Sequence, residues 1–163
     1  MKKMLLILFI AANSFAQRNY KVDGAGIVWQ HIYETNESEL IIKQLKSAKE
    51  TANLTFEDGL IYGVTDFYND DKSLYTNSMR YYLKVDVKNN KYRVTISDIA
   101  FKGGETTYGT QNLAFSKQEH YELNKWYLNK KGAIKKNKIN FLDKLSANFK
   151  RKYKIKIKKN DDW

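Results

Sequence analysis

The sequence predicts an α+β fold in which a twisted antiparallel sheet packs against helix. Residues 79–87 and 92–99 both alternate apolar and polar side chains, which is the period of a half-buried strand. Asn89-Asn90 joins them as a two-residue turn, because Asn tolerates positive φ. Residues 40–52 repeat apolar side chains at spacings of three and four, which predicts an amphipathic helix. A hairpin beside such a helix indicates the α+β class.

The other elements of the N-terminal half follow from shorter signals. Residues 27–33 are β-branched and aromatic and predict the first strand, and Asn36 or Ser38 is a suitable cap for the helix after it. Residues 54–56 look extended, Asp58-Gly59 is a turn signal, and residues 60–68 alternate well enough for a strand. A polar loop is expected at 69–77, and Gly103-Gly104 is expected to close the hairpin.

The C-terminal part is expected to be mainly helical. Residues 105–118 have loop composition, and residues 119–129 favour a short helix. A second helix is predicted from Asn137, because apolar residues recur at helical spacing; they are Ile139, Leu142, Leu145, Phe149 and Tyr153. Residues 154–158 alternate, so they are either strand-like or a frayed continuation of this helix. The expected order is β-α-β-β-β-α, with a basic C-terminal helical extension.

The first residues have the pattern of a cleavable signal peptide. Lys2 and Lys3 precede an apolar run at 4–12, and Ser14 and Ala16 are small residues at the expected cleavage positions. The run is far shorter than the about 20 residues of a spanning helix. We therefore expect residues 1–16 to be removed near Ala16-Gln17 and the mature protein to be periplasmic or secreted. No later stretch is apolar enough to predict a transmembrane segment.

The composition restricts the chemistry. The chain has no cysteine, which excludes disulfides, thiol nucleophiles and cysteine-based metal sites. Its two histidines, His31 and His120, have no second His at helical ligand spacing, so no metal and no cofactor is predicted. Glu57-Asp58 and Asp70-Asp71 lie in turn-like segments, where acidic residues are common. Asp66 and Asp98 stand at strand positions and are the best candidates for a pair of catalytic carboxylates.

The basic charge is concentrated at the C-terminal end. Residues 17–124 hold 13 basic and 15 acidic residues, whereas residues 125–163 hold 14 basic and 3 acidic residues. Such a segment can bind anionic lipid, glycan or an acidic protein. The alternative is a solvated helix face whose apolar stripe packs on the chain's own sheet. The candidate residues for an anionic surface are Lys130, Lys131, Lys135, Lys136, Lys150, Arg151, Lys152, Lys154 and Lys156; Lys138, Lys158 and Lys159 belong to the same two runs.

Several segments resemble a known family. They are Asp23-Gly24, the predicted helix at 37–52, the segment 58–63 and, above all, the strand–turn–strand block 85–98. They resemble a family of bacterial secreted proteins known as a domain of unknown function with a TATA-binding-protein-like fold. The resemblance covers about residues 22–101 and implies that fold. It does not imply DNA binding, because fold does not determine function, and an exported protein is not expected to meet nucleic acid.

These observations predict a signal peptide at 1–16, an α+β domain at 17–104 and a loop with a basic helical extension at 105–163. We expect an exported, non-catalytic binding or interaction module that contacts an anionic envelope surface or partner through its basic C-terminal part. One alternative is a cell-envelope hydrolase that uses scattered carboxylates such as Asp66 and Asp98. Another is a structural subunit that pairs with a partner through an edge strand.

Overall fold

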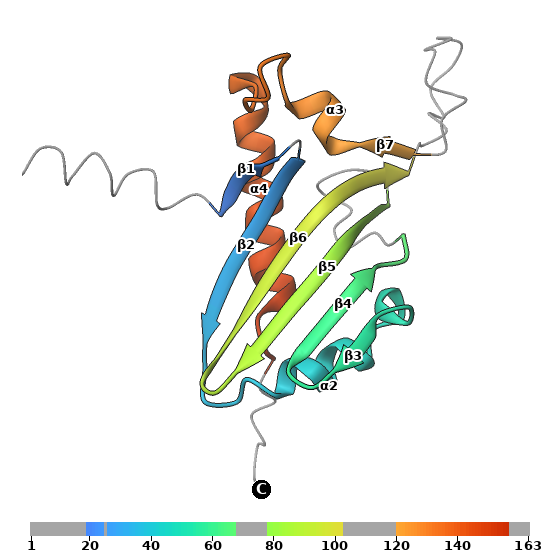
Figure 1. Cartoon of the computed structure of the whole chain (residues 1–163), viewed down its shortest axis with the longest axis vertical. Helices are drawn as coiled ribbons and strands as arrows, with labels where there is room; N and C mark the ends of the chain where they lie inside the picture. The colour runs from blue at the N-terminus through green and yellow to red at the C-terminus, as the bar shows by residue number, and fades with distance from the viewer. Residues whose placement is uncertain (1–18, 25, 68–77, 103–119, 157–163) are drawn as a thin grey trace, which may run out of the picture.

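The computed structural model describes residues 19–24, 26–67, 78–102 and 120–156. These residues form one antiparallel sheet with the strand order β1-β2-β6-β5-β4-β3, and β7 also pairs with β6 (Figure 1). The strands are β1 (Tyr20–Asp23), β2 (Gly26–Glu34), β3 (Thr55–Glu57), β4 (Leu60–Val64), β5 (Met79–Lys88), β6 (Lys91–Lys102) and β7 (His120–Glu122). The helices are α2 (Leu40–Lys46), α3 (Leu123–Tyr127) and α4 (Ile139–Tyr153), with 3-10 turns η1 (Lys49–Thr51) and η2 (Lys136–Lys138). The antiparallel α+β prediction is confirmed.

The predicted hairpin lies in the middle of the sheet. β5 and β6 pair in the register Leu83↔Ile96 and Val85↔Val94, with Asn89-Asn90 at the turn. Asn90 has a φ of 61°, in the left-handed region that Asn tolerates better than most residues. The alternation of side chains and the turn residue therefore specify the same pairing register, which places the apolar faces of β5 and β6 on the same side of the sheet.

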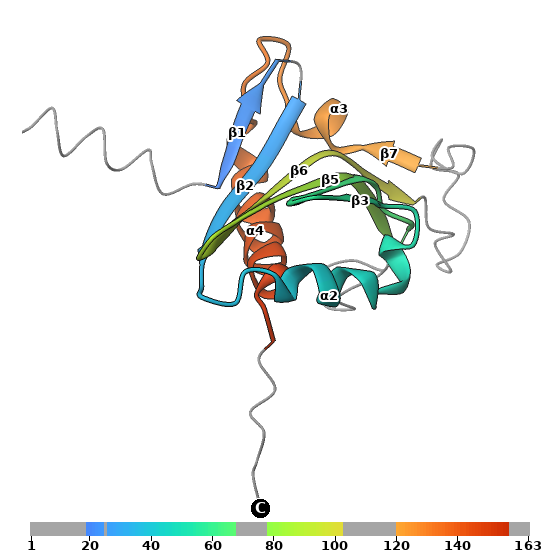
Figure 2. The same cartoon turned by 60° about the horizontal axis from the view of Figure 1, so that its bottom comes forward.

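Helices α2 and α4 lie on the same side of the sheet (Figure 2). The sheet residues that face them are buried, including Trp29, Leu83 and Val94. The ring of Phe149 from α4 lies 5.3 Å from the Trp29 ring, centroid to centroid. Four of the five residues predicted for the apolar stripe of α4 are buried in the core; they are Leu142, Leu145, Phe149 and Tyr153. Burial of this apolar surface is the main force that holds the two layers together.

The opposite face of the sheet is not covered by α2 or α4 (Figure 2). It carries a mixture of apolar, aromatic and charged side chains, with Ile32 54% exposed. The strands at its two edges are short: β1 has four residues and β3 has three. Short edges offer few unpaired backbone groups to another strand, so the described sheet gives little support to the edge-pairing alternative.

Four elements differ from the sequence prediction. β1 was missed, and the helix expected to reach residue 52 ends at Lys46, because Ala48 adopts extended backbone (φ −87°, ψ 131°) before η1. The strand expected at 60–68 ends at Val64. The helix expected at 119–129 begins at Leu123, because His120–Glu122 pair with β6 instead. In the last case, pairing with a neighbouring strand overrides a local pattern.

Helix α4 belongs to the core and is not an extension. One cluster of buried side chains contains residues from both sides of residue 104, among them Trp29, Tyr81, Leu145 and Phe149. A boundary after residue 104 therefore does not separate two cores, because a sheet without α4 would expose its apolar face to water. The predictions for the signal peptide at 1–16, the loops at 69–77 and 105–118, and Lys158 and Lys159 fall outside the described residues.

Candidate functional site

The predicted basic residues lie at the two ends of α4. Lys130, Lys131, Lys135 and Lys136 precede the helix, and the second group starts at Lys150 in its last turn. A helix of 15 residues is about 22 Å long. The charge concentrated in the C-terminal sequence is therefore divided into two surfaces at opposite ends of the molecule (Figure 1).

The C-terminal end of α4 is held by side chains from the sheet and from α2. The last four carbonyls of any α-helix have no partner within the helix. In α4, three of these four carbonyls accept hydrogen bonds from other elements: Lys150 O from Tyr33 Oη (3.0 Å), Lys152 O from Gln44 Nε2 (3.1 Å) and Tyr153 O from Tyr92 Oη (2.7 Å). The partners stand on β2, α2 and β6 respectively.

Two of these partners also hold the residues that follow the helix. Tyr92 Oη accepts a hydrogen bond from the Ile155 N–H at 3.2 Å, and Gln44 Oε1 accepts one from the Lys156 N–H at 3.2 Å. Lys154 is extended (φ −69°, ψ 128°), so the chain leaves the helix there and does not continue it. The exposed side chains of Lys150, Lys154 and Lys156 are thus presented from backbone that is fixed on both sides of the helix end.

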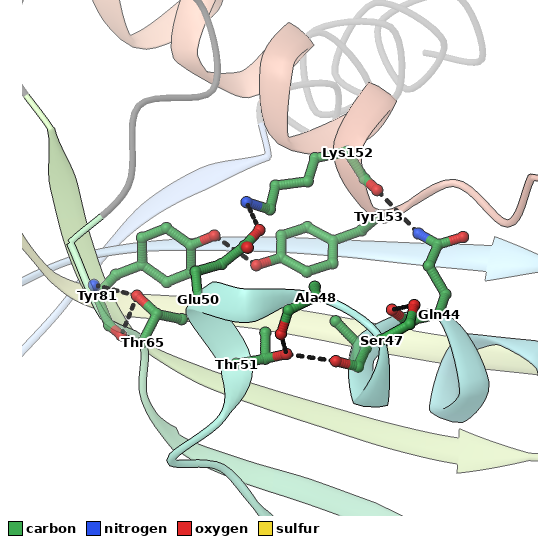
Figure 3. Close-up of polar contacts among 10 residues, drawn as sticks. Gln44, Ser47, Ala48, Glu50, Thr51, Thr65, Tyr81, Lys152 and Tyr153 are labelled. Atoms are coloured by element: carbon green, nitrogen blue, oxygen red, sulfur yellow. Dashed lines mark hydrogen bonds and ion pairs between the residues drawn. The ribbon is translucent and has the colours of Figure 1, made fainter.

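Lys152 has a different environment from its basic neighbours. Its Nζ lies 2.7 Å from Glu50 Oε1, and the two side chains are only 11% and 22% exposed (Figure 3). Nearby, the hydroxyls of Tyr81 and Tyr153 hydrogen-bond at 2.5 Å (Figure 3). Burial acts to raise the pKa of Glu50, but the hydrogen bond and the charge of Lys152 outweigh it, and the pKa is lowered. Lys152 therefore holds α4 to η1 and contributes little to an open surface.

Breaking this pair should destabilise the fold. We expect Glu50→Gln or Lys152→Met to lower the free energy of unfolding by about 1–3 kcal/mol, because each leaves a largely buried charge without its partner. The double variant should lose less than the sum of the two, as measured by urea unfolding at pH 7. A carboxylate whose pKa is lowered by folding stabilises the protein at pH values above its pKa in the unfolded chain, and this stabilisation is lost as the pH falls through the folded-state pKa. Glu50→Gln should therefore also make the free energy of unfolding depend less on pH on the acid side.

The exposed pair Lys125–Glu122 is the matched control for this cycle. Its nitrogen–oxygen distance is 3.2 Å, but its side chains are 73% and 51% exposed. Surface pairs of this kind contribute little, so Lys125→Met should leave the urea midpoint nearly unchanged. Equal losses from both pairs would contradict the structural role assigned to Lys152.

Lysines on α2 and η1 add to the charge at this end of the molecule. Lys43, Lys46 and Lys49 are exposed, and Lys43 is adjacent to Gln44, the residue that contacts the Lys156 backbone. Lys46 Nζ lies 5.3 Å from the centroid of the Phe56 ring. These three lysines were not predicted as binding residues, because they fall in the part of the chain whose basic and acidic residues nearly balance. The spacing of three residues between Lys43, Lys46 and Lys49 is the pattern in the sequence that could have indicated a shared basic surface.

The other basic group lies on a tight loop between α3 and α4. Leu128 and Ile134 form an isolated β-bridge, and the Asn129 side chain accepts hydrogen bonds from the backbone N–H groups of Lys131 (2.8 Å) and Ala133 (3.0 Å). Gly132 closes the loop with a φ of 76°, a conformation that favours glycine. Lys130 and Lys131 are exposed at the tip.

Aromatic residues lie beside this loop. Trp126 is 43% exposed, and its carbonyl accepts a hydrogen bond from Lys135 Nζ at 2.9 Å. Lys138 Nζ lies 5.4 Å from the centroid of the Tyr127 ring. Residues 123–142 contain six lysines and no acidic residue. Lys125 pairs with Glu122, but the other five lysines leave this end of the molecule with an excess of positive charge beside an exposed indole.

The candidate catalytic carboxylates are not brought together. Asp66 follows β4 and accepts a hydrogen bond from Asn53 Nδ2 (2.9 Å), whereas Asp98 lies on β6 and accepts one from Ser97 (3.0 Å). Strand β5 runs between β4 and β6, and strands are spaced about 4.8 Å apart. Asp98 has a φ of 51° where the register of β5 and β6 shifts, so its backbone has a local structural role.

The remaining candidates form no recognisable site in the described part of the chain. His31 Nδ1 lies 3.1 Å from Asn19 Oδ1, and burial together with the charge of Lys150 lowers its pKa. The side chain of His120 and residues Asp70-Asp71 fall outside the described residues. Among the described residues, no three His, Asp or Glu side chains gather where they could hold a metal ion. The described helices are also too short or too polar to cross a membrane.

Two solved structures are similar to this chain. One is a DUF4468 family protein from Bacteroides ovatus ATCC 8483, with a TM-score of 0.48 and 13% identity, covering 86% of this chain and 94% of that one. The other is a TBP-like protein from Parabacteroides distasonis ATCC 8503, with a TM-score of 0.46 and 12% identity, covering 82% and 94%. No protein-family model and no curated protein matches the sequence. The two structures carry the descriptions, a domain of unknown function and a TBP-like fold, that the sequence resemblance implied.

Proposed function

We propose that this chain is an exported, non-catalytic binding module that contacts an anionic partner in the cell envelope through the basic residues around α4. The observation that carries the proposal is the presentation of exposed lysines at both ends of α4 from fixed backbone. Lys130 and Lys131 stand on the loop braced by Asn129, and Lys154 and Lys156 follow a helix end braced by Gln44 and Tyr92.

At the N-terminal end of α4, the electrostatics support a binding role more than a stabilising one. Positive charge near a helix C-terminus is favourable, but near the N-terminus it is unfavourable. Lys135, Lys136 and Lys138 directly precede α4, whose first turn has no acidic residue and whose N-cap has no side-chain hydrogen bond. These lysines therefore interact unfavourably with the dipole of α4, a cost that is expected where residues serve a ligand.

Binding to polyanions tests the proposal. Each lysine near an anionic surface contributes about 1 kcal/mol, so Lys130→Ala/Lys131→Ala and Lys154→Ala/Lys156→Ala should each weaken binding by roughly thirtyfold. The measurement for both variants is elution from immobilised heparin across a salt series, and co-sedimentation with phosphatidylglycerol vesicles tests whether the unaltered protein also binds an anionic lipid surface. We also expect the exported protein to start at Gln17, after removal of residues 1–16, and N-terminal sequencing checks this.

Lys84→Ala/Lys102→Ala is the matched control, because it removes the same charge outside both clusters. It should weaken binding far less than either cluster variant. Equal losses in all three variants would mean that only net charge matters and would contradict the assigned surfaces. Failure of the unaltered protein to bind either polyanion at low salt would contradict the function itself, and exported protein that still begins at Met1 would contradict the proposed route.

A further inference from the structure

The loop between α3 and α4 differs from the other basic surface in its shape. It lies at one end of the molecule, beyond the ends of β1 and β2 (Figure 2). Its tip is built from Lys130, Lys131 and Gly132, all exposed. A projecting tip of this kind suits a broad anionic surface better than a narrow ligand, because it has no walls to enclose one.

The loop also combines charge with an exposed aromatic ring. Trp126 is 43% exposed, and its backbone carbonyl accepts a hydrogen bond from Nζ of one of the basic residues, Lys135. Indole rings concentrate at the level of lipid headgroups, where one part of the ring is apolar and the N–H meets water. The basic residues at the other end of α4 have no exposed large apolar side chain among their described neighbours at 150–156.

We propose that the segment 126–136 is a peripheral membrane contact, in which the lysines bind anionic phospholipid headgroups and Trp126 enters the interface. This inference rests on the proposed function and names its partner as a lipid bilayer. The loop is preorganised for that contact, since Asn129 and Gly132 fix its backbone before binding, so little conformational entropy is lost on docking. The other end of α4 then faces away from the bilayer.

Intrinsic fluorescence tests this proposal on the full chain. Trp29 is buried, so in a Trp163→Phe background Trp126 is the exposed reporter. Its emission should shift to the blue on addition of phosphatidylglycerol vesicles and should be quenched by lipids brominated near the headgroup. Pure phosphatidylcholine vesicles should produce neither change, because they carry no net charge for the lysines.

Two variants separate lipid binding from polyanion binding in general. Trp126→Ala should lose about tenfold in vesicle affinity, since it removes interfacial apolar area, but should keep its affinity for heparin. Lys130→Ala/Lys131→Ala should lose affinity for both vesicles and heparin. Ile32→Ala, which removes a similarly exposed apolar side chain from the open sheet face, should bind vesicles as the unaltered protein does, and urea midpoints should show that all variants are folded.

The outcomes distinguish the two proposals. Heparin binding without a Trp126 blue shift on anionic vesicles would overturn the membrane contact and point to a glycan or an acidic protein, with the proposed function intact. An equal loss from Ile32→Ala and Trp126→Ala would also overturn it. Absence of binding to both probes would overturn the proposed function and this inference together.

Discussion

Truncation of Phe149 to alanine should lower the free energy of unfolding by about 3–5 kcal/mol, the range for removing a buried aromatic ring. The Phe149 ring is 1% exposed and lies 5.3 Å from the ring centroids of both Trp29 and Tyr81. Its loss would leave a cavity between α4 and the centre of the sheet that neither layer can close. Urea unfolding followed by circular dichroism measures the effect.

Asn140→Ala on the exposed side of the same helix is the control for this prediction. It should leave the unfolding midpoint almost unchanged, because surface substitutions away from specific contacts have small effects. If Phe149→Ala costs less than about 1 kcal/mol, α4 is an appendage to a sheet that is stable alone, as the boundary after residue 104 implied. That result would contradict the single core described above.

Removal of one hydroxyl, in Tyr92→Phe, should lower the free energy of unfolding by about 2–4 kcal/mol. This hydroxyl donates to Tyr153 O and accepts from the Ile155 N–H. Each buried polar group left without a partner costs about 1–3 kcal/mol, and the substitution leaves two. Tyr62→Phe, which removes a hydroxyl at the exposed pair with Glu57, is the control and should change the urea midpoint little.

The same residue gives the protein a defined sensitivity to alkali. Burial raises the pKa of Tyr92 to about 12, whereas the unfolded chain ionises near its ordinary value of about 10. The folded state therefore keeps this proton while the unfolded state loses it, and stability falls as the pH rises through that interval. Tyr92→Phe should make the decline between pH 10 and 12 shallower. It should not abolish the decline, because burial also raises the pKa of Tyr33.

The elements that sequence predicted correctly are those whose signal is local. The β5–β6 hairpin needs only alternation and Asn90 at its turn. Helix α4 needs only its apolar stripe, which runs from Ile139 to Tyr153. β1 and β7 have four and three residues, too few for a period to appear. They exist as strands because β2 and β6 offer them backbone partners.

The features of the candidate site also fall into those that the sequence predicts and those that it does not. The sequence by itself determined which side chains carry charge, that no acid interrupts residues 123–142, and that α4 would have one apolar face. It did not reveal that the charges separate to two ends of the molecule, or that Lys152 pairs with Glu50.

Only the tertiary structure decided how the basic residues are held. Gln44 reaches the Lys152 carbonyl across 108 positions of sequence, and Tyr33 reaches the Lys150 carbonyl across 117. Local periodicity reports which face of an element is buried, but it does not report which distant side chain meets an unpaired carbonyl. Those contacts form only when the packing of the apolar stripe of α4 on the sheet brings β2, β6 and α2 to the end of the helix.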